Sequence, residues 1–179
     1  VPRKLREKGI QVSVVEINPD TLKSAKKFFH YETKGTKIFF EDARTFVKKC
    51  INKYDIVLID LFQGDGMPEH ITTKEFYQDI KTCMTSKGLL VTNNFISSKN
   101  ISARMHFLAT IYSVFGNAYF YQNKKSTYNA FTVATKSFPL TTHFNLDDIP
   151  AIMKGRVKST LKTQQEIHLN IFSRYKVST

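Results

Sequence analysis

Short apolar segments alternate with helical patterns along the first 115 residues, and each apolar segment ends at a polar side chain. These segments cover 12–16, 37–42, 55–60 and 89–93. The helical patterns between them predict parallel strands, whose carboxyl ends share the edge where open α/β sheets bind ligands. We therefore expect Glu16, Asp42, Asp60 and Asn93 to converge on one crevice.

Local signals place the helices between these strands. Asn18 followed by Pro19 predicts a helix start, because asparagine is a good N-cap and proline suits the first helical position. Thr72 and Glu75 form a capping-box pattern for a later helix, which Gly88 is expected to end. Residues 2–8 look helical, with Gly9 as the expected stop, and apolar residues at helical spacing predict further helices over 46–51 and 101–115.

The pattern changes after residue 115. Strands at 118–122 and 128–135 are joined by a short polar segment, which allows only antiparallel pairing, and the chain looks helical again from Leu146. An alternating α/β series closed by an antiparallel hairpin is the layout of the S-adenosylmethionine-dependent methyltransferase fold. We expect a single α/β domain over 1–179, Rossmann-like, with a mostly parallel sheet that ends in this hairpin.

Charge and residue spacing indicate which ligands the chain is expected to bind. The net charge of +12 comes from 27 Lys and Arg against 15 Asp and Glu. The lysines stand singly or in pairs, so we do not expect nucleic-acid binding; stacking of RNA on the hairpin aromatics is the alternative considered. The Cys and His spacings do not match a metal site.

Location is predicted from the same composition. The chain shows neither an apolar stretch of about 18 residues nor a signal-peptide pattern, so we expect a cytoplasmic protein that does not bind a membrane. Cys50 and Cys83 each lie on an apolar helical face, where free thiols are expected.

Two of the strand-end carboxylates suit a nucleoside. Glu16 can accept hydrogen bonds from both ribose hydroxyls, or it can cap the helix that follows. Asp42 can accept from the exocyclic amine of adenine, or act as the N-cap of its own helix. The sequence leaves both alternatives open.

Four motifs follow one another in order and spacing: Val14–Pro19, Glu41–Arg44, Tyr54–Phe62 and Thr73–Tyr77. Together they resemble the spermidine synthase family, the polyamine aminopropyltransferases, and the similarity covers residues 1–135. The resemblance implies that decarboxylated S-adenosylmethionine, or S-adenosylmethionine, is the cosubstrate. It also assigns cofactor binding to Glu16, Ile17, Asp42 and Ala43, with no metal.

The resemblance also implies a polyamine or other amine acceptor, such as putrescine. Asp60 matches the carboxylate that orients this amine and accepts its proton. Gln63, which stands where the family has a second carboxylate, and Asp65 are expected to bind the acceptor. The sequence leaves the oligomeric state open, with a homodimer as one alternative. A small-molecule methyltransferase and a non-catalytic binding module are the alternative functions.

The glycine-rich turn of such folds lies about 20 residues before the ribose carboxylate. Counting back from Glu16 passes Val1. We therefore expect the first strand of the fold and its glycine loop to be missing from this chain.

Overall fold

The structure is a computed structural model that describes residues 1–62, 67–95, 101–122, 129–135, 146–147 and 149–167. It divides into two compact units, Val1–Cys50 and Ile51–Thr179, and each is described by itself. The expectation of a single domain stays a prediction.

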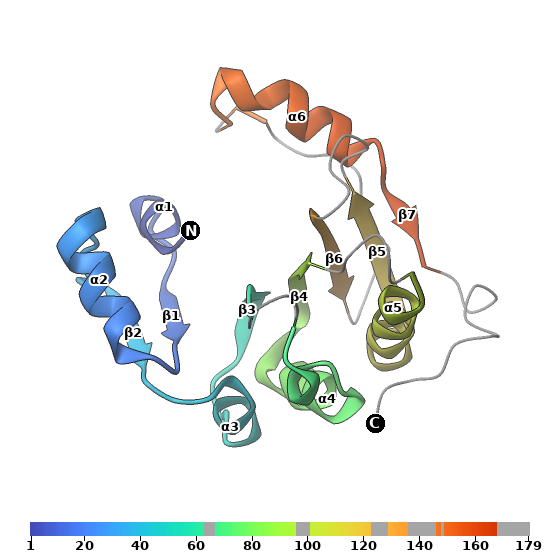
Figure 1. The fold of residues 1–179 in the computed structure, drawn as a ribbon, viewed down its shortest axis with the longest axis horizontal. Coiled ribbons are helices and arrows are strands. Elements are labelled where there is room, and N and C mark those ends of the chain that lie inside the picture. Colours follow the sequence, from blue (N-terminus) through green and yellow to red (C-terminus); the bar gives the residue numbers. More distant parts are fainter. Residues whose placement is uncertain (63–66, 96–100, 123–128, 136–145, 148, 168–179) are drawn as a thin grey trace. The chain divides into compact units, whose positions relative to one another are not determined.

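The first unit is a two-stranded sheet with three helices (Figure 1). Its elements are α1 (Pro2–Glu7), β1 (Val12–Val15), α2 (Pro19–Phe29), β2 (Thr36–Phe39) and α3 (Ala43–Lys48). The strands β1 and β2 pair in parallel, as predicted. Asn18 caps α2, because its side chain accepts a hydrogen bond of 2.9 Å from the backbone N–H of Asp20. The predicted helix start is confirmed.

The second unit contains a five-stranded sheet. Its elements are β3 (Tyr54–Ile59), the 3₁₀ turn η1 (Glu69–Ile71), α4 (Lys74–Cys83), β4 (Met84–Phe95), α5 (Ile101–Phe115), β5 (Asn117–Gln122), β6 (Asn129–Thr135), α6 (Ala151–Leu161) and β7 (Gln165–Glu166). The strand order is β3-β4-β6-β5-β7, where β3 and β4 are parallel and the other pairs antiparallel. The predicted change from parallel strands to an antiparallel hairpin is confirmed.

The parallel or antiparallel pairing of neighbouring strands gives their relative directions. Because β6 is antiparallel to both β4 and β5, those two strands run the same way, and β3 runs with them. The carboxyl ends of β3, β4 and β5 therefore share one edge. Among the described strands, β1 pairs only with β2, and β3 only with β4; the missing first strand stays a prediction.

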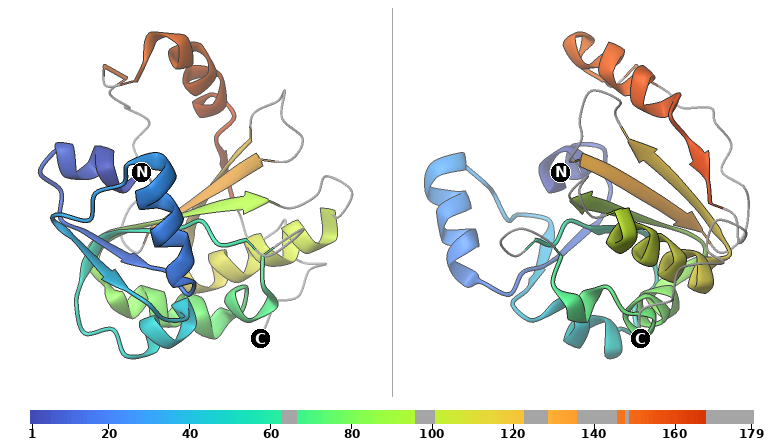
Figure 2. Two further views of the ribbon diagram at one scale, coloured as in Figure 1. Left: turned by 60° about the vertical axis from the view of Figure 1, so that its left-hand side comes forward. Right: turned by 45° about the vertical axis from the view of Figure 1, so that its right-hand side comes forward.

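Helices lie on both sides of the five-stranded sheet, α4 and α5 on one side and α6 on the other (Figure 2). The core lies between the sheet and the α4–α5 layer. Phe76 and Ile80 of α4, Ile111 of α5 and Leu90 of β4 are all at most 1% exposed. This packing buries one face of β4 against α4 and α5.

Two predicted boundaries of α4 are wrong. The helix is capped by Thr73, whose Oγ1 accepts from the N–H of Phe76 at 3.4 Å, while the hydroxyl of Thr72 donates to the Glu69 carbonyl and closes η1. The helix then passes directly into β4 at Met84. Gly88 lies within that strand, near its register shift against β3, where an added Cβ would lie 3.0 Å from Met84 Cβ.

Three further expectations differ from the structure. The C-terminal helix ends at Leu161, and β7 follows it as an edge strand beside β5. The continuously apolar residues of β3 are typical of a strand that is buried on both faces, but Ile56 and Leu58 are 56% and 47% exposed. Neither cysteine is a free thiol, so that expectation is wrong. A sequence pattern places a cysteine on a helical face but does not show which atoms its sulfur contacts in the fold.

Candidate functional site

A hydrogen bond joins two of the predicted site residues at the carboxyl edge of the five-stranded sheet. The amide Nδ2 of Asn93 donates to Oδ1 of Asp60 at 2.9 Å. Asp60 directly follows the last residue of β3, and Asn93 lies in the neighbouring parallel strand, where Ile59 pairs with Thr92. The predicted convergence of Asp60 and Asn93 is therefore observed.

The charge of Asp60 is not neutralised within the described residues. Its side chain is exposed, and its one polar contact there is the neutral amide of Asn93. A carboxylate accepts hydrogen bonds at both oxygens, so further acceptor positions remain for a donor. This arrangement suits a cationic N–H group better than an anion or an apolar group.

Glu16 extends the ladder of the two-stranded sheet. Its backbone N–H donates to the Phe39 carbonyl at 3.0 Å, which places Glu16 at the carboxyl end of β1. One carboxylate oxygen, Oε1, accepts from the N–H of Asn18 at 2.9 Å, just before α2. This oxygen thus contacts Asn18, the residue that caps α2, so Glu16 supports the start of the helix without being its cap. A carboxylate has capacity for more hydrogen bonds, and the ribose contact stays a prediction.

Asp42 lies at the same edge, after β2. Its Oδ1 accepts from the N–H of Thr45 at 3.0 Å, so Asp42 is the N-cap of α3. The N-cap alternative is confirmed, and contact with adenine stays a prediction. Both roles are compatible, because the two carboxylate oxygens offer several acceptor positions.

The other predicted site residues have less defined surroundings. Ile17 is 68% exposed, which leaves its apolar surface open to a ligand, and Ala43 is half-buried in the first turn of α3. Gln63 and Asp65 lie outside the described residues. Because Glu16 and Asp42 belong to the first unit and Asp60 and Asn93 to the second, a common crevice for all four stays a prediction.

The sequence profile of the spermine/spermidine synthase domain matches residues 6–143, more than half of the chain. The chain belongs to the spermine/spermidine synthase family. This confirms the resemblance drawn from the four motifs.

Relatives in this family are named polyamine aminopropyltransferases. The protein from Vibrio vulnificus (strain CMCP6) is 37% identical over 112 residues, which cover 60% of this chain and 36% of that protein. The protein from Thermoplasma volcanium is 30% identical over 98 residues, which cover 51% of this chain and 36% of that protein. The chain thus spans little more than a third of the length of these curated relatives.

Solved structures of the same fold support the predicted architecture. The spermidine synthase from Thermotoga maritima matches with a TM-score of 0.68 at 16% identity, covering 89% of this chain and 58% of that one. Human methyltransferase-like protein 13 in complex with SAH matches with a TM-score of 0.65 at 17% identity, covering 90% and 73%. The methyltransferase-like Rossmann fold predicted for this spermine/spermidine synthase family member is confirmed.

A buried polar chain that sequence reasoning missed lies next to Asn93. The hydroxyl of Thr92 donates to Oδ1 of Asn94, whose Nδ2 donates to Oγ1 of Thr132, both at 2.6 Å. All three residues are at most 1% exposed. Polar residues at positions 92 and 94, on one face of a strand otherwise rich in apolar residues, were the available signal.

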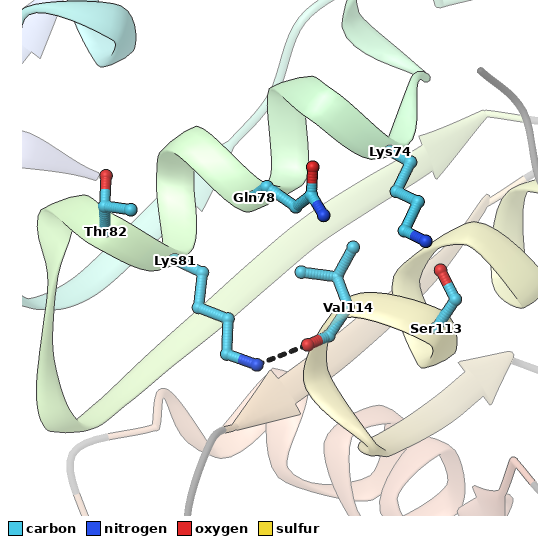
Figure 3. A pocket seen from close by; sticks show the side chains of 6 residues that line it. All are labelled: Lys74, Gln78, Lys81, Thr82, Ser113 and Val114. Atoms are coloured by element: carbon cyan, nitrogen blue, oxygen red, sulfur yellow. Dashed lines mark hydrogen bonds between the residues drawn. The ribbon is translucent and has the colours of Figure 1, made fainter.

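A shallow pocket of ≈360 Å³ lies between α4 and α5 (Figure 3). Lys81 spans the two helices, because its ammonium donates to the Val114 carbonyl near the end of α5. The pocket is also lined by Lys74, Gln78, Thr82 and Ser113. None of the predicted site residues lines this pocket, so it is separate from the site expected in this family member.

Within the residues that the structure describes, no three His, Cys, Asp or Glu side chains come together as metal ligands. No helix there is both long and apolar enough to cross a membrane.

Proposed function

We propose that this chain contributes the nucleoside- and amine-binding residues of an aminopropyltransferase. In the reaction, a diamine such as putrescine attacks the carbon next to the sulfonium of decarboxylated S-adenosylmethionine. The new C–N bond forms as the C–S bond breaks, methylthioadenosine leaves, and the amine loses one proton. Membership of the spermine/spermidine synthase family and the names of the relatives support this reaction class.

The observation that carries the proposal is the exposed Asp60 carboxylate at the sheet edge, whose one hydrogen bond among the described residues comes from the Asn93 amide. An attacking amine must be unprotonated, so a base near the nucleophile accelerates the reaction. The net charge of +12 repels a polycation at long range, which leaves attraction of the acceptor to local carboxylates. Asp60 is the residue proposed for both tasks, and Gln63 and Asp65 are proposed to contact the rest of the acceptor.

The nucleoside part is proposed to bind at the carboxyl edge of β1 and β2. Glu16 would accept from the ribose hydroxyls and Asp42 from the adenine amine, with Ile17 and Ala43 beside the base. The support is the placement of both carboxylates at the ends of adjacent parallel strands, where such folds bind nucleotides. No metal is required, because the sulfonium is already a good leaving group.

The test measures products. The chain is incubated with putrescine and decarboxylated S-adenosylmethionine, and in parallel with S-adenosylmethionine, and the products are identified by mass spectrometry. Methylthioadenosine together with spermidine supports aminopropyl transfer. S-adenosylhomocysteine would instead indicate a methyltransferase, and a folded chain that gives no product and binds no methylthioadenosine would contradict the proposal.

Asp60→Asn is the decisive variant, because it keeps the shape of the side chain but cannot act as a base. We expect turnover to fall at least about 100-fold, in line with loss of a general base, while methylthioadenosine affinity is unchanged. Asp55→Asn is the matched control at the other end of β3, where Asp55 accepts from the Thr85 hydroxyl. Equal losses in the two variants would contradict the role of Asp60.

A further inference from the structure

The chemistry of the Asn93–Asp60 contact fixes how the amide is oriented. An ionised carboxylate only accepts hydrogen bonds, so the amide must present its Nδ2 donor to Asp60, as observed at 2.9 Å. This hydrogen bond occupies Oδ1 of Asp60 and leaves Oδ2 for other donors. The amide is thus a donor to the proposed base rather than a competing acceptor.

The strand around Asn93 is anchored on both sides. Its neighbours Thr92 and Asn94 are buried and belong to the hydrogen-bonded chain that reaches Thr132 in β6. The backbone of the same segment pairs with β6, where Asn93 lies opposite Phe131. The half-buried side chain of Asn93 therefore projects from a fixed point.

Asp60 has less support of its own. It lies one residue beyond β3, its side chain is exposed, and within the described residues its one hydrogen bond comes from Asn93. An exposed aspartate without a partner samples several rotamers. A donor on the rigid neighbouring strand selects among them.

We infer that Asn93 is a positioning residue for Asp60, which holds the carboxylate through Oδ1 so that Oδ2 receives the acceptor amine. This inference rests on the proposed function. It extends that function to the neighbouring strand β4, where Asn93 is half-buried. Asn93 acts through Asp60 and is given no contact with the cosubstrate.

Kinetics of three variants test the role. Asn93→Ala is expected to lower kcat/KM for putrescine about 10- to 100-fold, the effect of losing a hydrogen bond to a charged group, with methylthioadenosine affinity unchanged. Asn93→Asp keeps the shape but places a second carboxylate against Asp60, and is expected to lose at least as much. Asn93→Gln keeps the donor and is expected to recover part of the rate.

The matched control is Asn117→Asp, which makes the same chemical change in β5 at the opposite edge of the sheet. It is expected to retain wild-type kinetics. An Asn93→Ala protein with wild-type kcat/KM, or one whose nucleoside affinity falls as far as its turnover, would overturn the positioning role.

A spectroscopic measurement separates this inference from the proposed function. In ¹⁵N–¹H spectra, the side-chain amide signals of Asn93 are identified by their loss in Asn93→Asp. Asp60→Ala is expected to shift those signals, whereas Asp55→Ala is not. Unchanged signals in Asp60→Ala would overturn the inference even if transfer occurs. If the wild-type chain neither binds nor transfers putrescine, the proposed function fails, and the shift alone decides whether Asn93 positions Asp60.

Discussion

The side-chain amide of Asn94 donates a hydrogen bond of 2.6 Å to Oγ1 of Thr132, although both residues are almost completely buried. The bond joins β4 to β6 diagonally, since Thr132 lies opposite Thr92 in the register. A buried polar group without a partner is costly, so this contact is a condition for the sheet as well as a support for the site.

Asn94→Leu is therefore expected to destabilise the chain. The change leaves the hydroxyls of Thr92 and Thr132 without their partner, which should lower the free energy of unfolding by about 1–3 kcal/mol in urea titrations. The triple variant Thr92→Val, Asn94→Leu, Thr132→Val removes all three polar groups together and should recover part of the loss. A single variant as stable as wild type would show that the chain of hydrogen bonds contributes nothing.

Glu16→Gln tests the proposed ribose contact. Because a neutral amide accepts weaker hydrogen bonds than a carboxylate, methylthioadenosine affinity by isothermal titration should fall about 10-fold or more. Asp20→Asn is the control, since Asp20 lies in the first turn of the same helix but pairs with Lys23 at the surface. Equal affinities for wild type and Glu16→Gln would contradict the assignment.

Two substitutions separate the two roles of Asp42. Asn is a good N-cap, so Asp42→Asn should keep the start of α3 and lower only the nucleoside affinity. Asp42→Ala loses the cap as well and should cost about 0.5–2 kcal/mol of stability. The two variants are compared by thermal unfolding and by titration with methylthioadenosine. A variant pair that differs in stability but binds the nucleoside like wild type would leave Asp42 as a cap alone.

The burial of Tyr77 leads us to expect a loss of folding stability at alkaline pH. Its side chain is 0% exposed, and burial raises the pKa of its hydroxyl far above the ordinary value. Below about pH 10 the Tyr77 hydroxyl is neutral in the folded and in the unfolded chain. Above that pH the unfolded chain releases this proton, whereas the folded chain retains it. Stability should then fall by about 1.4 kcal/mol per pH unit from this residue.

Tyr77→Phe should remove that contribution. It should not weaken the fold at neutral pH, because the hydroxyl has no hydrogen-bond partner among the described residues and the ring keeps its edge contacts with Phe76 and Phe107. Tyr112→Phe in α5 controls for the loss of one tyrosine. Urea titrations at pH 7 and above pH 10 measure the difference, and identical alkaline slopes for Tyr77→Phe and wild type would refute it.

Much of the site could be placed from the sequence, because each candidate stands at the end of an apolar segment. The positions of Glu16, Asp42, Asp60 and Asn93 relative to their own strands follow from local patterns alone. Local patterns did not decide between ligand binding and a helix-start role for Glu16 and Asp42. Each residue uses one carboxylate oxygen at a helix start, and only the folded turn shows that contact.

Errors arose where two local signals competed or where none existed. Thr72 and Thr73 are equally good caps, and the turn at Glu69–Ile71 takes the first, so the helix begins one residue later than predicted. Gly88 resembles a helix end but lies within a strand. The edge strand β7 has two residues, too few for any periodicity, and forms because β5 offers it an unpaired edge.

The sequence by itself determined the type and order of most elements, the change from parallel to antiparallel strands, and the placement of polar residues at strand ends. These properties depend on periodicity and on turn chemistry, which act between residues close in the chain. The tertiary structure decided that Asn93 donates to Asp60 and that Asn94 reaches Thr132. Each of these bonds joins residues more than 30 positions apart, at a register set by the pairing of whole strands.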